Sequence, residues 1–385
     1  MREMGINNKA EILYIKLKLE DGQGFINFLK KEFKNIQIIN QKFKILHENE
    51  YILFPIVKND ALIDNVIELL NQKINFEIIS KEGIPNENYK YSTLQEALKG
   101  KIPDKYLELI PKSYDIVGNI AIIEFDKLIN IDDMEFTDYK QKVAKGIPSV
   151  NKNVKTVYEK KSQIKGKYRL RELEILYGDD KSETTHKEND CIFKLDVKNT
   201  YFSPRLVFER RRIASARIQD DEIIVDMFAG VGTFSIQIAK EKNVKIYAFD
   251  VNPIAYQYLK ENVELNNLKG EIIPNSIDVK DLIVPKNQLG QFLCNKASRI
   301  IMNLPEDSIK FIDVACFLMK KSGGIIHFYQ FSEKPDPIEK TRENLEVELT
   351  HFNWEIESVI DSKIVKHYSP KSELVVVDLK IKASK

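Results

Sequence analysis

The sequence contains little cysteine. Only Cys191, Cys294 and Cys316 occur in 385 residues, and no two of them form a C-x-x-C pair. A zinc knuckle is built from such pairs, and a disulfide framework needs a regular set of spaced cysteines. The sequence therefore argues against both kinds of protein, and we expect no metal centre.

Long apolar runs are also missing. None approaches the ~20 residues of a membrane-spanning helix. The first twelve residues carry charges and lack the apolar core of a signal peptide. We therefore expect a cytoplasmic protein that has no membrane partner.

The chain has little net charge, but its charges are segregated. The total is +1, yet eleven Lys or Arg between residues 140 and 171 face one acid, Glu159. Three tyrosines lie in or beside this basic tract: Tyr139, Tyr158 and Tyr168. Basic groups neutralise phosphates and aromatic rings stack on bases. A solvated face is the alternative, but the near absence of acids favours a nucleic-acid partner.

A glycine turn is the main feature of the second half of the chain. Residues 223–234 read IIVDMFAGVGTF, an apolar run followed by Gly230, Gly232 and a segment of helical periodicity. This pattern predicts a strand, a tight turn and a helix. Glycines let the backbone pass close to a ligand, and the helix N-terminus offers free N–H groups. We expect a nucleotide-like ligand here.

The next strand narrows the choice of ligand. It covers residues 244–249 and ends at Asp250, twenty-four residues after Asp226, where an acid can bind ribose hydroxyls. A dinucleotide enzyme would usually add a third glycine, but Thr233 and Phe234 follow here. The motif D-x-F-x-G-x-G resembles the first motif of class I methyltransferases, which bind S-adenosylmethionine.

Polar residues end the following strands as well. The run 271–278 ends at Asp278, and the run 298–305 ends in Asn303-Leu304-Pro305. Carboxyl ends of parallel strands meet at one edge of a sheet, so Asp226, Asp250, Asp278 and Asn303 should converge. Residues 363–382 predict two strands and a turn, which would supply an antiparallel last strand.

The tripeptide Asn303-Leu304-Pro305 carries chemical information. An asparagine amide both donates and accepts hydrogen bonds, and the proline fixes the local backbone. Amino-methyltransferases often have N/D-P-P-Y/F here, so Leu304 and Glu306 favour a ring nitrogen over an exocyclic amino group as the target. The alternative is an ordinary turn between a strand and a helix.

Composition divides the chain into segments. Residues 1–80 alternate between strand-like and amphipathic helical runs, and residues 81–92 are polar and typical of a linker. Residues 93–192 predict a second α+β domain, and residues 193–385 a doubly wound α/β domain. The first domain is either a structural appendage or a recognition module.

Several motifs in one order resemble a known family. They are HKEN (186–189), YFSPRL (201–206), ERRRI (209–213), the glycine turn, the tripeptide at 303–305 and KIVKHYSP (363–370). Together they resemble the archaeal and eukaryotic tRNA guanine-37 N1-methyltransferases, closely from residue 113 onward and in outline over the first eighty residues.

The resemblance implies a fold and an activity. The fold is a class I, Rossmann-like methyltransferase sheet with an antiparallel last strand, preceded by two smaller α+β RNA-binding domains. The activity is methyl transfer from S-adenosylmethionine to N1 of guanosine 37 in tRNA. In the family the first domain contacts the tRNA elbow, and the other two grip the anticodon stem-loop. We expect a monomer.

The resemblance also assigns roles to residues. It makes Glu209 the general base and Arg169 the cation that faces the guanine carbonyl, while Asn303 and Pro305 match the target-positioning motif. The resemblance and the strand-end pattern predict these cofactor contacts: Tyr201, Arg210, Asp226, Phe228, Gly230, Asp250, Val251, Asp278, Val279 and Asn303. Many relatives have proline where Thr233 stands, a difference that should affect the helix start and not the reaction.

The residue types suit this chemistry. Guanine N1 carries a proton at neutral pH, so a base must remove it while a cation stabilises the charge that spreads to O6. Glu209 and Arg169 can fill these roles. Glu209 lies among Arg205 and the arginines at 210–212, so it should ionise readily and would need an apolar wall or the substrate to take up a proton. Tyr201 is a candidate to stack on the flipped guanine.

Alternative functions share this fold. One is C-methylation of the wyosine intermediate at the same tRNA position, with or without the N1 activity, and another is aminocarboxypropyl transfer to that intermediate. Glu209 and the tripeptide at 303–305 argue against the aminocarboxypropyl transferase. A non-catalytic RNA-binding protein would not need the strand-end acids.

Overall fold

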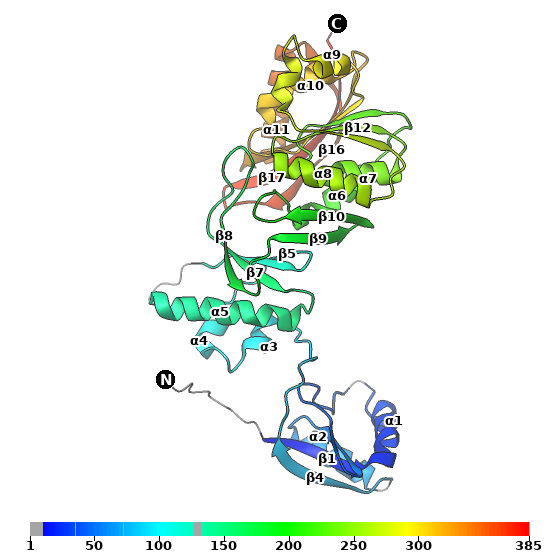
Figure 1. The fold of residues 1–385 in the computed structure, drawn as a ribbon, viewed down its shortest axis with the longest axis vertical. Coiled ribbons are helices and arrows are strands. Elements are labelled where there is room, and N and C mark those ends of the chain that lie inside the picture. Colours follow the sequence, from blue (N-terminus) through cyan, green and yellow to red (C-terminus); the bar gives the residue numbers. More distant parts are fainter. Residues whose placement is uncertain (1–10, 35, 72, 127–131, 385) are drawn as a thin grey trace. The chain divides into compact units, whose positions relative to one another are not determined.

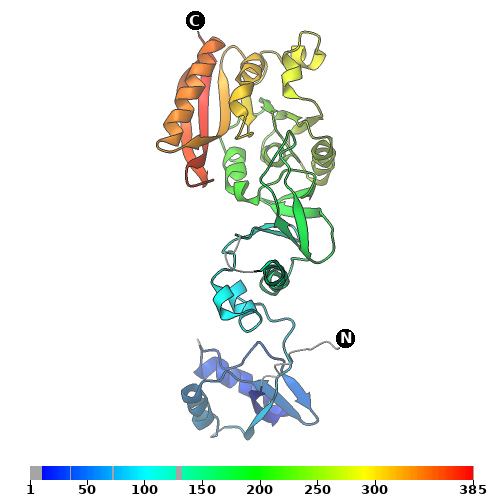
Figure 2. The same ribbon diagram turned by 90° about the vertical axis from the view of Figure 1, so that its left-hand side faces the viewer.

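The computed structural model describes residues 11–34, 36–71, 73–126 and 132–384. The chain divides into two compact units, Met1–Thr93 and Leu94–Lys385. Figures 1 and 2 show the elements of both units, coloured along the sequence. The predicted linker, 81–92, lies just before the boundary between the units.

The first unit is a small α+β fold. Its antiparallel sheet has the order β2-β3-β1-β4. The strands are β1 (Glu11–Lys18), β2 (Leu46–Glu48), β3 (Tyr51–Pro55) and β4 (Phe76–Glu82), and the helices are η1 (Leu19–Asp21), α1 (Gly22–Glu32) and α2 (Asp60–Leu70). Ile15 and Leu17 alternate along β1 and pack on Phe25 of α1. The α+β prediction is confirmed.

The segment predicted as a linker begins inside this unit. Strand β4 continues to Glu82, and the backbone beyond it still pairs with the loop before β2. The N–H of Lys44 donates to the carbonyl of Ile84, and the N–H of Asn86 donates to that of Lys42, both at 2.8 Å. Residues 81–86 are therefore ordered by the sheet, because backbone pairing overrides their polar composition.

The second unit begins with helices packed on a four-stranded sheet of order β5-β6-β7-β8. The elements are α3 (Leu94–Leu98), α4 (Asp104–Leu107), β5 (Asp115–Val117), β6 (Ile120–Ile123), α5 (Asp133–Val150), β7 (Thr156–Lys160) and β8 (Leu173–Tyr177). Helix α5 crosses between the parallel strands β6 and β7.

A hairpin joins this sheet to the next. It consists of β9 (Glu183–Glu188) and β10 (Cys191–Asp196), and η2 (Pro204–Leu206) and α6 (Val207–Ala214) follow. The domain limit predicted between residues 192 and 193 thus falls inside β10. Ile120 and Tyr158 share one apolar core with Phe193 and Ile213, so packing is continuous across that limit.

The largest element is a seven-stranded sheet of order β13-β12-β11-β14-β15-β17-β16. Its strands are β11 (Ile223–Asp226), β12 (Lys245–Phe249), β13 (Glu271–Asn275), β14 (Arg299–Met302), β15 (Gly324–Glu333), β16 (Trp354–His367) and β17 (Ser372–Ala383). Strands β11 to β15 are parallel, and β17 runs antiparallel between β15 and β16. The predicted class I methyltransferase fold is confirmed.

Helices cover both faces of this sheet (Figure 1). They are α7 (Thr233–Glu241), α8 (Pro253–Leu265), η3 (Val279–Ile283), α9 (Gln288–Leu293), η4 (Ser308–Phe311), α10 (Ile312–Leu318) and α11 (Pro337–His351). Because side chains alternate along a strand, Ile224 packs in the core with α6 and α7, whereas Val225 packs in the core with α10 and α11. No helix in the described ranges has the length and apolar content needed to cross a bilayer.

Candidate active site

The strand-end acids gather at one edge of the large sheet, as predicted. Asp226 ends β11, is fully buried, and accepts a hydrogen bond on Oδ2 from Ser235 Oγ at 2.7 Å. Asp250 follows β12 and accepts from the N–H groups of Gly230 and Asn252, each at 2.8 Å. Asp278 caps η3 by accepting from the N–H of Lys280. The three carboxylates therefore lie at one edge of the sheet, and Asp250 contacts the glycine turn directly.

The glycine turn leaves space for a ligand. Gly230 and Gly232 have φ of +57° and +92°, values that side chains disfavour. A Cβ at Gly232 would lie 2.5 Å from Leu259 Cδ1, whereas the nearest atom to a Cβ at Gly230 would be the Tyr201 carbonyl oxygen at 3.8 Å. Gly232 is thus required for packing, and the space beside Gly230 is open at the start of α7.

The three acids have different proton affinities. Burial raises the pKa of Asp226 to about 7, against the hydrogen bonds from Ser235 and the Phe228 N–H. Burial also raises the pKa of Asp250, although two N–H donors oppose it. For Asp278, burial is outweighed by the Lys167 ammonium, 2.9 Å from Oδ2, and the Lys280 N–H, so its pKa is lowered.

The other predicted cofactor residues lie along the same edge. Val251 directly follows Asp250 and is half-buried, and Val279 begins η3 and is buried. Phe228 packs edge-on against Phe311, with ring centroids 5.0 Å apart. Asn303 follows β14, and its buried Oδ1 has no hydrogen-bond partner among the described residues. An open turn, strand-end acids and an unpaired amide oxygen fit an adenosine-bearing cofactor.

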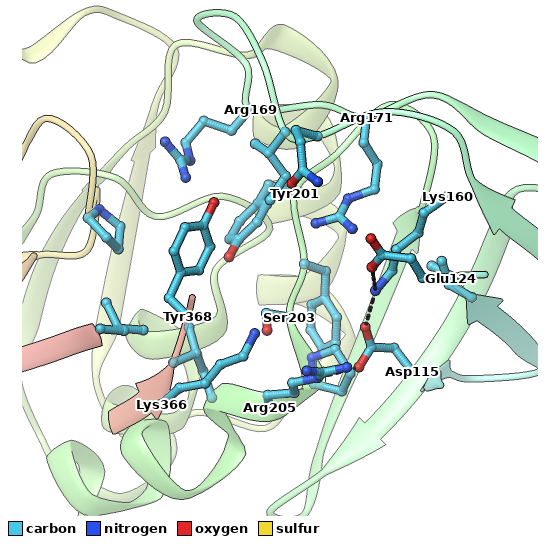
Figure 3. Close-up of a pocket in the computed structure, with 18 of the residues that line it drawn as sticks. Asp115, Glu124, Lys160, Arg169, Arg171, Tyr201, Ser203, Arg205, Lys366 and Tyr368 are labelled. Carbon is cyan, nitrogen blue, oxygen red and sulfur yellow. Dashed lines mark hydrogen bonds and ion pairs between the residues drawn. The ribbon is translucent and has the colours of Figure 1, made fainter. Parts of the chain in front are cut away.

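A cavity of about 610 Å³ in the second unit is lined by three predicted residues, Arg169, Tyr201 and Pro305. Arg169 comes from the β7–β8 loop, Tyr201 from the segment after β10, and Pro305 from the turn after β14. Figure 3 shows Arg169 and Tyr201 beside this common space. Segments far apart in sequence thus form one site.

Arg169 is held by a residue that we did not predict as part of the site. Its Nη1 lies 2.7 Å from Glu306 Oε2, and its Nη2 donates to Oε1 at 3.1 Å. The guanidinium carbon lies 5.7 Å from the centroid of the Tyr201 ring. Nε of Arg169 is buried without a partner in the described part of the chain. Glu306, which directly follows the 303–305 tripeptide in the sequence, therefore holds the Arg169 guanidinium beside Tyr201.

The C-terminal hairpin forms another wall that the sequence analysis missed. Lys366 and Tyr368 line the cavity, and Tyr368 stacks on Phe331 with ring centroids 4.0 Å apart. Both residues belong to the KIVKHYSP motif. This motif contributed to the family resemblance, but nothing in it indicated that Lys366 and Tyr368 line the site.

Glu209 does not line this cavity. It is 4% exposed in α6, and its Oε2 accepts from Arg212 Nε at 3.0 Å and from the Tyr329 hydroxyl at 3.2 Å. Lys363 Nζ lies 2.6 Å from Oε1. Tyr329 and the cavity residue Phe331 are two positions apart on β15, so they face the same side. Glu209 thus lies outside the cavity lining, and Arg212, Tyr329 and Lys363 occupy its two oxygens, so a proton-accepting role requires a rearrangement that frees one of them.

Comparisons with known proteins agree with this geometry. Residues 184–357 match the TRM5/TYW2 methyltransferase domain, and residues 94–181 match the TYW2 N-terminal domain. The tRNA (guanine(37)-N(1))-methyltransferase Trm5b of Pyrococcus abyssi is 32% identical over 96% of this chain and 99% of its own length. The chain belongs to the TRM5/TYW2 methyltransferase family.

Two solved structures of TRM5/TYW2 proteins show the same fold. One is the complex of aTrm5 and tRNALeu, with a TM-score of 0.69 and 33% identity over 96% of this chain and 99% of that chain. The other is Methanocaldococcus jannaschii TYW2 in complex with AdoMet, with a TM-score of 0.52 and 28% identity over 70% of this chain and all of that chain.

Arg210 of the ERRRI motif, a predicted cofactor contact, is bound to other residues of the protein. Arg210 is 1% exposed, forms a two-point ion pair with Glu188 of the HKEN motif, and donates to the Ser203 carbonyl at 3.1 Å. Its guanidinium carbon lies 5.2 Å from the Phe202 ring centroid. Arg210 therefore fixes the segment that carries Tyr201. A direct cofactor contact would need these bonds to open, and that role stays a prediction.

The basic tract, residues 140–171, was predicted to bind nucleic acid because it contains eleven cations and one acid, but in the fold several of these cations form ion pairs. Lys140 pairs with Glu159 at 2.9 Å with both groups buried, and other lysines of the tract pair with acids from elsewhere in the chain. Tyr139 and Tyr158 are 3% and 0% exposed and cannot stack on bases as predicted. Folding brings distant acids to the tract, which a linear count of charges does not reveal.

Proposed function

We propose that this chain transfers a methyl group from S-adenosylmethionine to N1 of guanosine 37 in tRNA. The observation that carries the proposal is the cavity in which Arg169, Tyr201 and Pro305 meet, with the Tyr201 carbonyl oxygen beside the open space at Gly230. The names of the relatives support it, since Trm5b of Pyrococcus abyssi is a tRNA (guanine(37)-N(1))-methyltransferase and aTrm5 was solved with tRNALeu.

The sheet edge would hold the cofactor. Asp250 suits ribose hydroxyls and Asp278 suits an adenine amino group, because carboxylates accept hydrogen bonds from both. We assign the surrounding surface to Asp226, Phe228, Gly230, Val251, Val279 and Asn303. When bound, S-adenosylmethionine supplies an electrophilic methyl group. The AdoMet complex of the TYW2 relative supports this choice of cofactor.

The cavity would hold the flipped guanine. Tyr201 offers a ring face for stacking, and the Arg169 guanidinium can stabilise the negative charge that develops on O6. Asn303, with its unpaired Oδ1, and Pro305 would position the ring edge. Glu209 would take the N1 proton after a rearrangement that moves Lys363 off Oε1 and brings the carboxylate to the cavity, so that nitrogen loses its proton, gains the methyl carbon, and the bond from that carbon to the departing neutral thioether breaks.

Nucleoside mass spectrometry tests the activity. An unmodified tRNA transcript with guanosine at position 37, incubated with the protein and labelled S-adenosylmethionine, should yield 1-methylguanosine. A transcript with adenosine at that position should yield none. Labelled product from both transcripts, or from neither, would contradict the proposal.

The Glu209→Gln variant tests the base. It should lower the single-turnover methylation rate by ~10²–10⁴, the range of general acid–base catalysis, and a higher pH should restore part of the rate. Asp361→Asn is the matched control, since Asp361 also binds Arg212 but does not contact Glu209. Equal rates for Glu209→Gln and wild type would leave Glu209 as a structural partner of Arg212.

A second candidate is modification of the wyosine intermediate at the same tRNA position. The likeness to TYW2 favours it, since the family model covers TRM5 and TYW2 proteins alike. The same assay decides between the candidates when the substrate tRNA carries the intermediate, because a methyl and an aminocarboxypropyl product differ in mass. A product from that substrate alone would replace the proposed function.

We further propose that the protein acts as a cytoplasmic monomer that contacts both the anticodon stem-loop and the tRNA elbow. The elbow contact is what the family resemblance implies for the first unit, and the match to Trm5b covers 96% of this chain and so includes that unit. Hydroxyl-radical footprinting should show protection at both regions, and light scattering should give the mass of one chain. Protection of the anticodon arm alone would remove the elbow from the proposal.

A further inference from the structure

The cavity contains more cations than its acids can neutralise. Its charged lining consists of Asp115, Glu124, Lys160, Arg169, Arg171, Arg205 and Lys366, apart from His367. Arg205 pairs with Asp115 at 2.7 Å, Lys160 pairs with both Asp115 and Glu124 at 3.1 and 3.8 Å, and Arg169 pairs with Glu306, so three acids compensate three cations. Arg171 and Lys366 form no ion pair with any carboxylate of the described residues. Two positive charges therefore face the cavity without a counter-ion.

These two side chains come from different parts of the chain. Arg171 lies at the end of the β7–β8 loop, and Lys366 lies near the end of β16. In Figure 3 the two side chains point into the same space from opposite sides, with Tyr201 and Tyr368 beside them. The cavity therefore has an aromatic wall and a pair of facing cations.

The electrostatics of this arrangement favour an anion. Burial lowers the pKa of Lys366, and the charges of Arg205, Lys160 and Arg171 lower it further, while Asp115 opposes them. An anion between the cations would relieve their mutual repulsion and replace the hydration that Lys366 has lost. A volume of about 610 Å³ lies within the roughly 300–1,000 Å³ of small-ligand pockets, enough for a nucleotide with its phosphate.

We propose that Arg171 and Lys366 form a phosphate-binding subsite for the RNA strand next to the nucleotide that enters the cavity. The inference rests on the proposed function, since flipping a base also draws its sugar and flanking phosphates toward the enzyme. We assign the ligand as a phosphodiester, because Gly230, Asp250 and Asp278 do not line the cavity; Tyr201, a predicted cofactor contact, does line it, so the cofactor carboxylate is the alternative anion that calorimetry tests below. The subsite would hold the backbone while Tyr201 contacts the base.

The first test uses the Arg171→Met and Lys366→Met variants of the full chain. Each should raise the tRNA concentration for half-maximal single-turnover methylation about tenfold and flatten the salt dependence of tRNA binding by about one unit. Lys371→Met is the matched control, because Lys371 is exposed in the same hairpin and does not line the cavity. Unchanged salt slopes for both variants would overturn the subsite.

Calorimetry with S-adenosylmethionine separates the two sources of anion. Neither variant should change the cofactor affinity. A loss of cofactor affinity equal to the loss of tRNA affinity would assign the cations to the cofactor carboxylate and overturn the proposal.

A neutral methylphosphonate provides a test that does not depend on how well a variant folds. The phosphates on either side of nucleotide 37 are replaced one at a time. At one position the replacement should weaken tRNA binding by the wild-type protein about tenfold, and at that position it should not weaken binding by Lys366→Met any further. If the affinity losses caused by the methylphosphonate and by Lys366→Met add in full at every position, the subsite is overturned. These binding measurements stand even if wild type yields no 1-methylguanosine, a result that would refute the proposed function alone.

Discussion

Asp226 should make the stability of the second unit depend on pH. Its side chain is fully buried at the end of β11, with Ser235 donating to Oδ2 and with no partner for Oδ1 among the described residues. Burial raises its pKa to about 7, against about 3.9 for an unperturbed aspartate. Replacing it with asparagine keeps the shape and removes the titration.

The sign of the effect follows from where the proton is bound. Below pH ~4 the folded and unfolded chains both carry the proton, so the group contributes no pH dependence. Between about pH 4 and 7 only the folded chain keeps the proton, and stability falls by about 1.4 kcal/mol per pH unit. From pH 5 to 7 this loss is about 2.3 kcal/mol, because the folded chain is half deprotonated at pH 7, and above pH ~8 stability no longer changes because both states are ionised.

Urea unfolding at several pH values measures this contribution. Trp354, the only tryptophan, begins β16 and so reports on the second unit. Without cofactor, the free energy of unfolding of Asp226→Asn minus that of wild type should rise by about 2.3 kcal/mol from pH 5 to 7 and level off above pH ~8. In the control Asp278→Asn, the same difference should be flat, because the lowered pKa of Asp278 puts its titration below this range. Parallel wild-type and Asp226→Asn curves would refute the reasoning.

Three further changes test other contacts. Glu306→Gln alone should slow methylation, but the same change in an Arg169→Ala background should lower the rate little further. Equal rate losses in the two backgrounds would show that Glu306 does not act through Arg169. Glu188→Gln leaves Arg210 buried without a counter-charge, so urea unfolding should show a loss of about 3–5 kcal/mol, and a loss below ~1 kcal/mol would contradict this. Lys140→Met should destabilise the chain yet leave the salt slope of tRNA binding unchanged, and a flatter slope would return Lys140 to the RNA-binding surface.

Much of the large sheet could be predicted because its signals are local. The turn around Gly230 follows from backbone sterics, and Asp226, Asp250 and Asp278 end apolar runs that can be recognised within a few residues of sequence. Parallel strands align their carboxyl ends, so these local signals also predicted that the acids meet. These local signals were sufficient to predict which edge of the sheet would hold the cofactor.

The cavity could not be predicted in the same way, because its walls depend on contacts between distant segments. Arg169 and Glu306 are 137 positions apart, and nothing near either residue shows that they pair. Lys366 lies in a motif whose sequence gives no hint that its strand reaches the β7–β8 loop. Glu209 was expected beside the target, but α6 turns it toward Arg212 and Lys363.

The sequence by itself determined where the strands, turns and strand-end acids lie, because hydrophobic periodicity and glycine geometry act over a few residues. Tertiary structure alone decided which charges are free. Lys140 is neutralised by a buried glutamate nineteen positions away, whereas Arg171 and Lys366 are left facing each other across the cavity. Coulomb energy depends on distance in space and on burial, and neither quantity is contained in the order of residues along the chain.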